Sequence, residues 1–235
     1  MPLDTHDASL ISIHAITPRV KQYLLRVDGH TFDYQPGQHT SIVPPFEDHT
    51  VARPYSPVNL PGTDTIALAI KRYEEGTVST WMDERAVGDT VPITDVKGNL
   101  HIRDFRRDVV FLSTGTGITP MLAMLKAYLR RGEGTATFVY GERTQDDLMY
   151  RETLDQLRSE HAQLQVGYVL SHEEWTGPTG FVQHHLDRFA DTMDAHFYLC
   201  GVPAMVVATE DELEDRGVAP DDIFVEGWEH GAVDG

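Results

Sequence analysis

The residues best suited to chemistry stand in a short turn between an apolar run and an amphipathic segment. Positions 111–121 read FLSTGTGITPM, with glycines at 115 and 117. A glycine lacks a Cβ, so backbone or ligand can approach closely. The peptide N–H groups that open a following helix attract phosphate. The turn therefore predicts a phosphate site. Pro120 stands where a third glycine would complete the usual dinucleotide motif, so a tightly packed strand-to-helix crossover is the alternative.

A second candidate is RPYSPV at residues 53–58, where two prolines stiffen an extended segment. Side chains alternate along extended backbone, which places Arg53 and Tyr55 on one face and Ser56 on the other side or at the rim. An arginine beside a tyrosine suits a ligand that carries both a phosphate and a flat ring. Ordinary solvated side chains on the outside of a strand are the alternative.

A third candidate is KRYEEGTVSTWM at residues 71–82. Gly76, followed by Val78 and Ser79 at the start of a helix, provides peptide N–H groups and a hydroxyl for a second phosphate. A helix whose own Thr77 or Ser79 caps its first turn explains the same residues without a ligand.

The elements that must position the second and third candidates belong to an antiparallel barrel or sandwich. Between about residues 10 and 100, short alternating apolar runs are separated by turn residues, with one helical piece at residues 78–85. The expected strands cover residues 11–16, 22–27, 38–44, 65–72 and 89–94. The turn around Pro36 and Gly37 is interpreted as mainly structural.

From residue 109 onward, strands and helices alternate, which predicts a doubly wound parallel sheet with a ligand across its carboxyl edge. The expected strands are 109–113, 136–141, 164–171, 196–201 and 223–228, and the expected helices are 120–131, 148–160, 182–190 and 203–216. We place the domain boundary within residues 101–108, giving domains 1–103 and 104–235. Arg143 and Arg151 could hold a phosphate of a dinucleotide ribose; ion pairs with neighbouring carboxylates are the alternative, especially for Arg151.

Composition limits the possible partners. The 235 residues include 37 acidic and 19 basic side chains, for a formal charge of -18. Such a chain repels nucleic acid and anionic membranes, and the same charge suits a protein of a high-salt cytoplasm, although an ordinary acidic protein is the alternative. No apolar run reaches the length of a membrane span and no signal peptide is recognisable, so we expect a cytoplasmic location.

Cysteine and histidine usage exclude further chemistries. Cys200 is the single cysteine, which excludes an internal disulfide and an iron–sulfur cluster held by several thiolates. The twelve histidines include no helical ligand pair such as H-E-x-x-H, so no catalytic metal is expected.

Taken in order, RPYS, GTVS, GTGITPM, CGVPAMV and a terminal E-x-aromatic resemble the ferredoxin–NADP reductase superfamily. The resemblance spans nearly the whole chain. It implies a six-stranded Greek-key β-barrel that binds FAD, followed by an α/β domain that binds NAD(P).

The resemblance also implies individual roles. Tyr55 would stack on the flavin ring, Arg53 would contact the FAD pyrophosphate, and Ser56 would hydrogen-bond near flavin N5. The FAD diphosphate would rest on Gly76, Val78 and Ser79, and the dinucleotide on residues 114–119, with Cys200 and Gly201 lining the nicotinamide pocket. Ser56, Cys200 and Glu226 are the catalytic candidates. The full set of expected cofactor-binding residues is Arg53, Pro54, Tyr55, Ser56, Lys71, Gly76, Val78, Ser79, Thr114, Gly115, Thr116, Gly117, Thr119, Pro120, Arg143, Ser171, Cys200, Gly201 and Trp228.

Two departures from the family pattern bear on these roles. Seven residues follow Trp228, where the aromatic residue of plant-type members ends the chain. Trp228 either covers the flavin, with Glu226 as proton or hydrogen-bond partner, or ends a core strand. NADPH-using members often carry Ser-Arg where this chain has Ser171 and His172; Arg143 could compensate, and we favour NADPH slightly over NADH.

The expected activity is hydride transfer between NAD(P)H and FAD, followed by electron transfer to a separate acceptor such as ferredoxin, flavodoxin or an oxygenase component. A free-flavin or ferric reductase is an alternative within the same class. A non-catalytic subunit that binds flavin or nucleotide and senses redox state is the alternative from another class.

Overall fold

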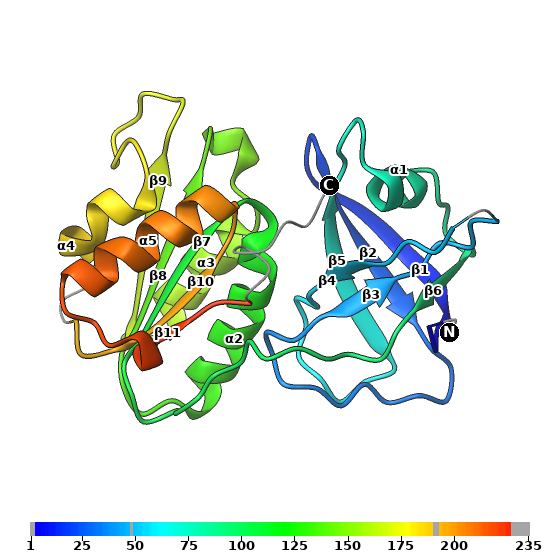
Figure 1. The fold of residues 1–235 in the computed structure, drawn as a ribbon, viewed down its shortest axis with the longest axis horizontal. Helices are drawn as coiled ribbons and strands as arrows, with labels where there is room; N and C mark the ends of the chain where they lie inside the picture. Colours follow the sequence, from blue (N-terminus) through cyan, green and yellow to red (C-terminus); the bar gives the residue numbers. More distant parts are fainter. Residues whose placement is uncertain (1–2, 48, 190–192, 227–235) are drawn as a thin grey trace. The chain divides into compact units, whose positions relative to one another are not determined.

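The computed structural model describes residues 3–47, 49–189 and 193–226 of the chain (Figure 1). The chain folds into two compact units, of which the first ends at His101 and the second begins at Ile102. Among the described residues, no helix combines the length and the apolar character needed to cross a lipid bilayer.

The first unit is an antiparallel six-stranded sheet with one short helix, as expected. Its elements are β1 (His6–Thr17), β2 (Val20–Arg26), β3 (Thr40–Ile42), β4 (Arg53–Tyr55), β5 (Thr65–Lys71), α1 (Thr77–Asp83) and β6 (Thr90–Ile93). The strand order is β4-β3-β6-β1-β2-β5, so β4 and β5 are the two edges of the sheet.

The segment that follows β4 joins these two edges. The Val58 N–H donates to the Ala67 carbonyl of β5 at 2.9 Å. The Asn59 side chain accepts from the Ala67 N–H at 2.8 Å and donates to the Thr65 carbonyl at 2.9 Å. The sheet therefore closes on itself, which satisfies edge groups that would otherwise be exposed.

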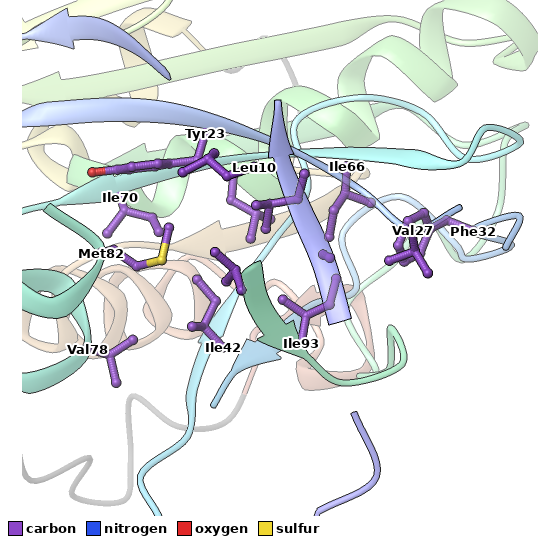
Figure 2. Close-up of a cluster of buried hydrophobic side chains, with 14 of the residues drawn as sticks. Leu10, Tyr23, Val27, Phe32, Ile42, Ile66, Ile70, Val78, Met82 and Ile93 are labelled. Atoms are coloured by element: carbon purple, nitrogen blue, oxygen red, sulfur yellow. The ribbon is translucent and has the colours of Figure 1, made fainter. Parts of the chain in front are cut away.

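The barrel encloses one apolar core, built from inward residues of β1, β2, β3, β5 and β6 together with α1. Figure 2 shows Val27 and Phe32 at one end of this core and Val78 and Met82 of α1 at the other. Val78 is 1% and Met82 0% exposed, so burial of these side chains holds the short helix α1 against the barrel.

The second unit is a five-stranded parallel sheet of order β11-β10-β7-β8-β9, which confirms the doubly wound expectation. Its elements are β7 (Val109–Thr114), η1 (Gly115–Gly117), α2 (Ile118–Arg131), β8 (Ala136–Glu142), η2 (Gln145–Asp147), α3 (Arg151–Glu160), β9 (Leu164–Leu170), η3 (Val182–His185), α4 (Leu186–Phe189), β10 (His196–Cys200), α5 (Pro203–Asp215), η4 (Pro220–Asp222) and β11 (Ile223–Phe224).

Helices cover both faces of this sheet (Figure 1). One face buries Val110, Leu112 and Leu199 against a core that includes residues of α4 and α5. The opposite face carries Phe111, whose ring stacks on Tyr198 with 5.4 Å between centroids. Strands that are buried on both faces have continuous apolar sequences. The strands of this sheet could therefore be predicted from the sequence.

The bounds of α1, α2 and α5 differ from the expected ones by one or two residues, and two other helices differ more. The helix expected at 148–160 begins only at Arg151, because Tyr150 adopts a left-handed backbone with φ 54° and the preceding residues form the turn η2. The helix expected at 182–190 starts as the 3-10 turn η3 and becomes α-helical at Leu186; residue 190 lies outside the described residues. The last expected strand, 223–228, pairs only at Ile223 and Phe224, and its residues 227 and 228 are not described.

Candidate functional site

The TGTGITP turn lies where expected, at the carboxyl end of the central strand β7. Thr114 ends β7, η1 follows, and α2 begins at Ile118. No side chain caps α2, and no acidic residue stands in its first turn. Gly115 adopts φ +58° and a Cβ at this position would meet nothing within 4 Å, so the turn faces open space there. These features suit an anionic ligand on the helix start.

The turn packs directly against the loop after β10. A Cβ on Gly117 would lie 2.2 Å from the Cys200 carbonyl oxygen, so position 117 accommodates only glycine without a shift of the backbone. The Val202 N–H donates to Thr114 Oγ1 at 3.1 Å. A Cβ on Gly201 would in turn lie 2.2 Å from Thr114 Oγ1. The predicted residues Thr114, Gly117, Cys200 and Gly201 therefore form one continuous backbone surface.

The hydroxyl of Tyr140, in β8, contacts the backbone of this turn, a role that the sequence reasoning missed. This hydroxyl lies 3.1 Å from the Gly115 carbonyl oxygen and 3.0 Å from Glu142 Oε1, and its one proton can be donated to either acceptor. Burial, followed by the negative charge of Glu142, raises the pKa of the Tyr140 phenol well above its ordinary value, so it remains a donor at physiological pH. A tyrosine inside an apolar strand was the only sequence signal for this contact.

The ends of β8 and β9 meet beside the turn. The Ser171 N–H donates to the Glu142 carbonyl at 3.0 Å, and Ser171 Oγ lies 2.8 Å from His172 Nδ1. Glu173 receives two hydrogen bonds of 2.7 Å from Gln145, which lower the pKa of its carboxyl and hold it in place. A fixed carboxylate therefore stands among the residues expected to contact the dinucleotide ribose.

The two arginines considered for a ribose phosphate differ. Arg143 is exposed, and no carboxylate among the described residues forms an ion pair with its guanidinium. Arg151 lies over the Tyr168 ring and approaches Asp155 Oδ2 at 3.8 Å, so its charge is partly balanced within α3. Arg143 is thus the better placed of the two to bind an external anion.

In the barrel, the RPYS residues lie on the edge strand β4 and directly after it. Arg53, Pro54, Tyr55 and Ser56 are each half-buried. Tyr55 packs against the barrel core, and burial raises the pKa of its phenol. The Ser56 hydroxyl donates to the Gly37 carbonyl at 3.4 Å, so the turn that we interpreted as structural contacts a catalytic candidate.

The GTVS residues open α1 as expected. Gly76 is the N-cap, no side chain caps the helix, and its first turn holds no acidic residue. Ser79 is 7% exposed, and its hydroxyl accepts a hydrogen bond of 3.4 Å from the N–H of Tyr73. Tyr73 lies before the helix, so this bond does not cap the first turn of α1. The capping role considered for Thr77 or Ser79 is therefore absent from this part of the structure. Lys71, at the end of β5, lies 5.9 Å from the Tyr73 ring.

The remaining predicted residues are placed as follows. Thr119 is buried and its hydroxyl donates to the Thr116 carbonyl at 3.0 Å, which closes the first turn of α2, and Pro120 is buried beside it. Cys200 is a buried thiol, 4% exposed, that forms no disulfide, and Glu226 is half-buried beyond β11. Trp228 lies outside the described residues.

The residues present fit the two expected cofactors. Each unit offers a helix start without a capping side chain or an acidic first turn, which leaves its peptide N–H groups for a diphosphate. The barrel adds an arginine and a half-buried aromatic ring on one strand, and the parallel sheet adds an open glycine turn at its centre.

Comparison with known proteins gives the same assignment. Residues 7–102 match the oxidoreductase FAD-binding domain, and residues 111–211 match the oxidoreductase NAD-binding domain. NADH-cytochrome b5 reductase 1 of Dictyostelium discoideum is 32% identical over 197 residues, covering 80% of this chain and 69% of that protein. The corresponding reductase of Mortierella alpina is 31% identical over 192 residues, and the match covers 77% of this chain and 64% of that protein.

A bacterial relative matches over nearly its full length. Ferredoxin–NADP reductase B of Sorangium cellulosum is 29% identical over 238 residues, covering 95% of this chain and 97% of that protein. The structure of a ferredoxin NADP+ reductase from Neisseria gonorrhoeae with bound FAD and NADP shares the fold, with a TM-score of 0.85, 20% identity, and coverage of 96% and 99%. The chain, with its FAD-binding and NAD-binding domains in this order, belongs to the ferredoxin–NADP reductase superfamily of oxidoreductases.

Proposed function

We propose that this flavoprotein transfers hydride between NAD(P)H and FAD and passes electrons to a separate acceptor protein. In this proposal residues 1–103 bind FAD and residues 104–235 bind the nicotinamide dinucleotide. When bound, the flavin converts the two-electron chemistry of the nicotinamide into single-electron steps.

One observation carries the proposal: the TGTG turn and the Cys200–Gly201 loop form a continuous backbone surface at the carboxyl edge of the central strands. Gly117 and Gly201 each leave no room for a Cβ. Ligands of open parallel sheets bind at this edge. Residues 114–119 would cradle the dinucleotide phosphates, with the peptide N–H groups of residues 115–117 as donors, while the loop after β10 would position the nicotinamide.

The barrel residues would hold and orient the flavin. Arg53 would bind pyrophosphate, Tyr55 would cover one face of the ring, and Ser56 would hydrogen-bond to it. Gly76, Val78 and Ser79 would receive the FAD diphosphate at the start of α1. Cys200 and Glu226 would act on the nicotinamide side, Glu226 as a proton or hydrogen-bond partner, and Trp228 would cover the flavin.

The choice between NADPH and NADH would depend on opposed charges at the ends of β8 and β9. Arg143 is exposed and would attract a 2′-phosphate, whereas the fixed carboxylate of Glu173 would repel it. The sequence alone favours NADPH slightly. The position of Glu173 supports the opposite preference, and the relatives named above include both an NADH and an NADP enzyme.

The acceptor would be ferredoxin, flavodoxin or an oxygenase component, and the cytochrome b5 reductase relatives add a small haem protein to these candidates. A free-flavin or ferric reductase would bind flavin loosely as a substrate. The combination of RPYS with an uncapped α1 favours retained FAD. A non-catalytic redox-sensing subunit is the remaining alternative.

A panel of acceptors tests this proposal. The FAD-loaded protein is assayed with NADPH and with NADH against ferredoxin, flavodoxin, cytochrome b5, free FMN and ferric citrate. Rapid reduction of one protein acceptor, with FAD still bound after gel filtration, supports the proposal. Activity with free FMN alone would indicate a flavin reductase, and activity with none of them a sensing subunit.

A further inference from the structure

Two histidines and an aspartate from three separate segments of the barrel meet at one place. The ligand atoms of His6, His30 and Asp95 all lie within 4.8 Å of one another. His6 Nε2 is 2.7 Å from Asp95 Oδ1, and the imidazole rings of His6 and His30 have centroids 4.5 Å apart. His6 and His30 are half-buried, whereas Asp95 is exposed.

The barrel holds these residues in register. His6 opens β1 and pairs with Ile93 of β6, two residues before Asp95. The backbone beside Asp95 is fixed because the Thr94 hydroxyl accepts from the Ser41 N–H at 3.0 Å and donates to the Asp95 carbonyl at 3.0 Å. The cluster is therefore anchored on the sheet.

His30 is fixed by its own turn and by the core. Its N–H donates to the Val27 carbonyl at 3.1 Å. Its ring makes an edge contact with Phe32, with 4.6 Å between centroids, and Phe32 is only 2% exposed. The imidazole of His30 therefore packs against the buried Phe32 ring and contacts the His6 imidazole.

We propose that His6, His30 and Asp95 form a site for a divalent transition-metal ion of the zinc class. Two imidazoles and one carboxylate are a common ligand set for such ions, and three protein ligands leave positions for water. In the proposed site, the metal would replace the hydrogen bond between His6 Nε2 and Asp95 Oδ1.

Closing the site requires only side-chain motion. Ligand atoms around a tetrahedral zinc ion lie about 3.3 Å apart, given zinc–ligand distances near 2.0 Å. The His6–Asp95 separation is already shorter than this, and His30 must approach the other two ligand atoms by no more than about 1.5 Å. The side chain of Asp95 is 76% exposed and can rotate to meet the ion.

The site lies away from the expected flavin helix. Phe32, which contacts His30, stands at the opposite end of the barrel core from Val78 and Met82 of α1 (Figure 2). A metal here would join the start of β1, the turn after β2 and the end of β6. We therefore assign it a stabilising role in the barrel, separate from the proposed chemistry.

Zinc titration of tag-free, FAD-loaded protein by calorimetry tests the site, with excess Mg²⁺ present to occupy carboxylates of the acidic surface. We expect one equivalent of Zn²⁺ to bind and the Tm of the protein to rise. H30A and D95N should each weaken binding at least tenfold. D95N keeps an oxygen that can accept from His6, so its Tm without metal should remain near that of the parent protein.

H14A is the matched control, because His14 is an exposed imidazole of the same strand. It should bind Zn²⁺ as the parent protein does. Equal zinc affinity in the parent, H30A and D95N would overturn the proposal and indicate diffuse binding by the acidic surface. Absence of zinc binding to the parent would mean that the cluster is only a histidine–aspartate hydrogen bond beside a second imidazole, and would likewise overturn the proposal. Neither result would affect the proposed reductase activity.

Discussion

At the scale of single residues, the proposed nucleotide-binding surface depends on two glycines that are close to neighbouring backbone and side-chain atoms. Gly117 faces the Cys200 carbonyl, and Gly201 faces Thr114, each with no room for a Cβ. Protein interiors cannot absorb even a methyl group without a shift of their neighbours. Any side chain at these positions would move the two loops apart, whereas Gly115 faces open space.

We expect G117A to slow flavin reduction by NAD(P)H about 100-fold, because a shift of about 1 Å in a positioning loop can have that effect. FAD content should be unchanged, since the barrel is not altered. Stopped-flow absorbance under anaerobic conditions measures the rate. G217A is the control: Gly217 has φ +85° with open space, so it should cost stability without changing the rate. A parent-like rate in G117A would show that the loop contact does not position the cofactor.

At the scale of elements, the flavin-binding candidates depend on how the segment after β4 is fastened to β5. The Asn59 side chain accepts from the Ala67 N–H and donates to the Thr65 carbonyl. The backbone carbonyl of Asn59 accepts from the Tyr34 hydroxyl at 2.9 Å. These bonds fix the segment that carries Arg53, Tyr55 and Ser56. The barrel closure at Asn59 therefore lies three residues after Ser56, on the same segment as the proposed flavin residues.

N59A should lower the free energy of unfolding by about 2 kcal/mol, because two side-chain hydrogen bonds to β5 are lost and a backbone group is left unsatisfied. It should also release FAD more readily. Urea denaturation and the flavin retained after dialysis measure the two effects. N59D keeps the acceptor for Ala67 and loses the amide donors, so its effects should be intermediate. If N59A keeps both stability and FAD, this closure does not hold the site.

Much of the fold could be predicted because periodicity and turn residues are local signals. The predicted turns of the barrel hold Gly29, Gly37, Gly62 and Gly88, all of which have positive φ. The five parallel strands were apparent as apolar runs. The start of α3 was predicted three residues early, because no local sequence pattern marks the left-handed backbone of Tyr150, where φ is 54°.

The candidate site was predictable only where its residues form short motifs. RPYS, GTVS and TGTG are contiguous, so their residue types and spacing were sufficient to propose them as site residues. Tyr140 and the cluster of His6, His30 and Asp95 depend on strand pairing between distant segments. No short spacing rule, such as that for helical metal ligands, detects them.

At the scale of the whole molecule, the net charge of -18 limits how the protein can meet an acceptor. Several of its basic residues already form ion pairs with carboxylates of the same chain. Arg72 pairs with Asp83, Arg106 with Asp104, and Arg107 with Asp194. Little positive charge from these residues is left to attract an acidic partner.

Reduction of an acidic ferredoxin should therefore become severalfold faster as salt is raised from a low concentration, because salt screens like charges. Initial rates at a fixed ferredoxin concentration measure this effect. A basic acceptor such as cytochrome c should show the opposite trend and serves as the control. A steady loss of ferredoxin reduction with salt would mean that a local basic surface guides docking.

The protein should lose stability as pH rises above about 10. Burial, as the largest cause, raises the pKa of Tyr23, Tyr128 and Tyr198 to about 12. The ordinary pKa of tyrosine is about 10, so the unfolded chain releases these protons first and folding stability falls between the two values. Urea denaturation at increasing pH measures the fall. Constant stability from pH 9 to 12 would contradict it.

The most direct test of the central claim is an absorbance spectrum of the purified protein followed by anaerobic titration with NADPH and NADH. We predict bound FAD that is bleached stoichiometrically by at least one of the two nucleotides, with the effective nucleotide fixing the cofactor preference. A colourless protein that takes up no added FAD, or an FAD complex that neither nucleotide reduces, would contradict the account.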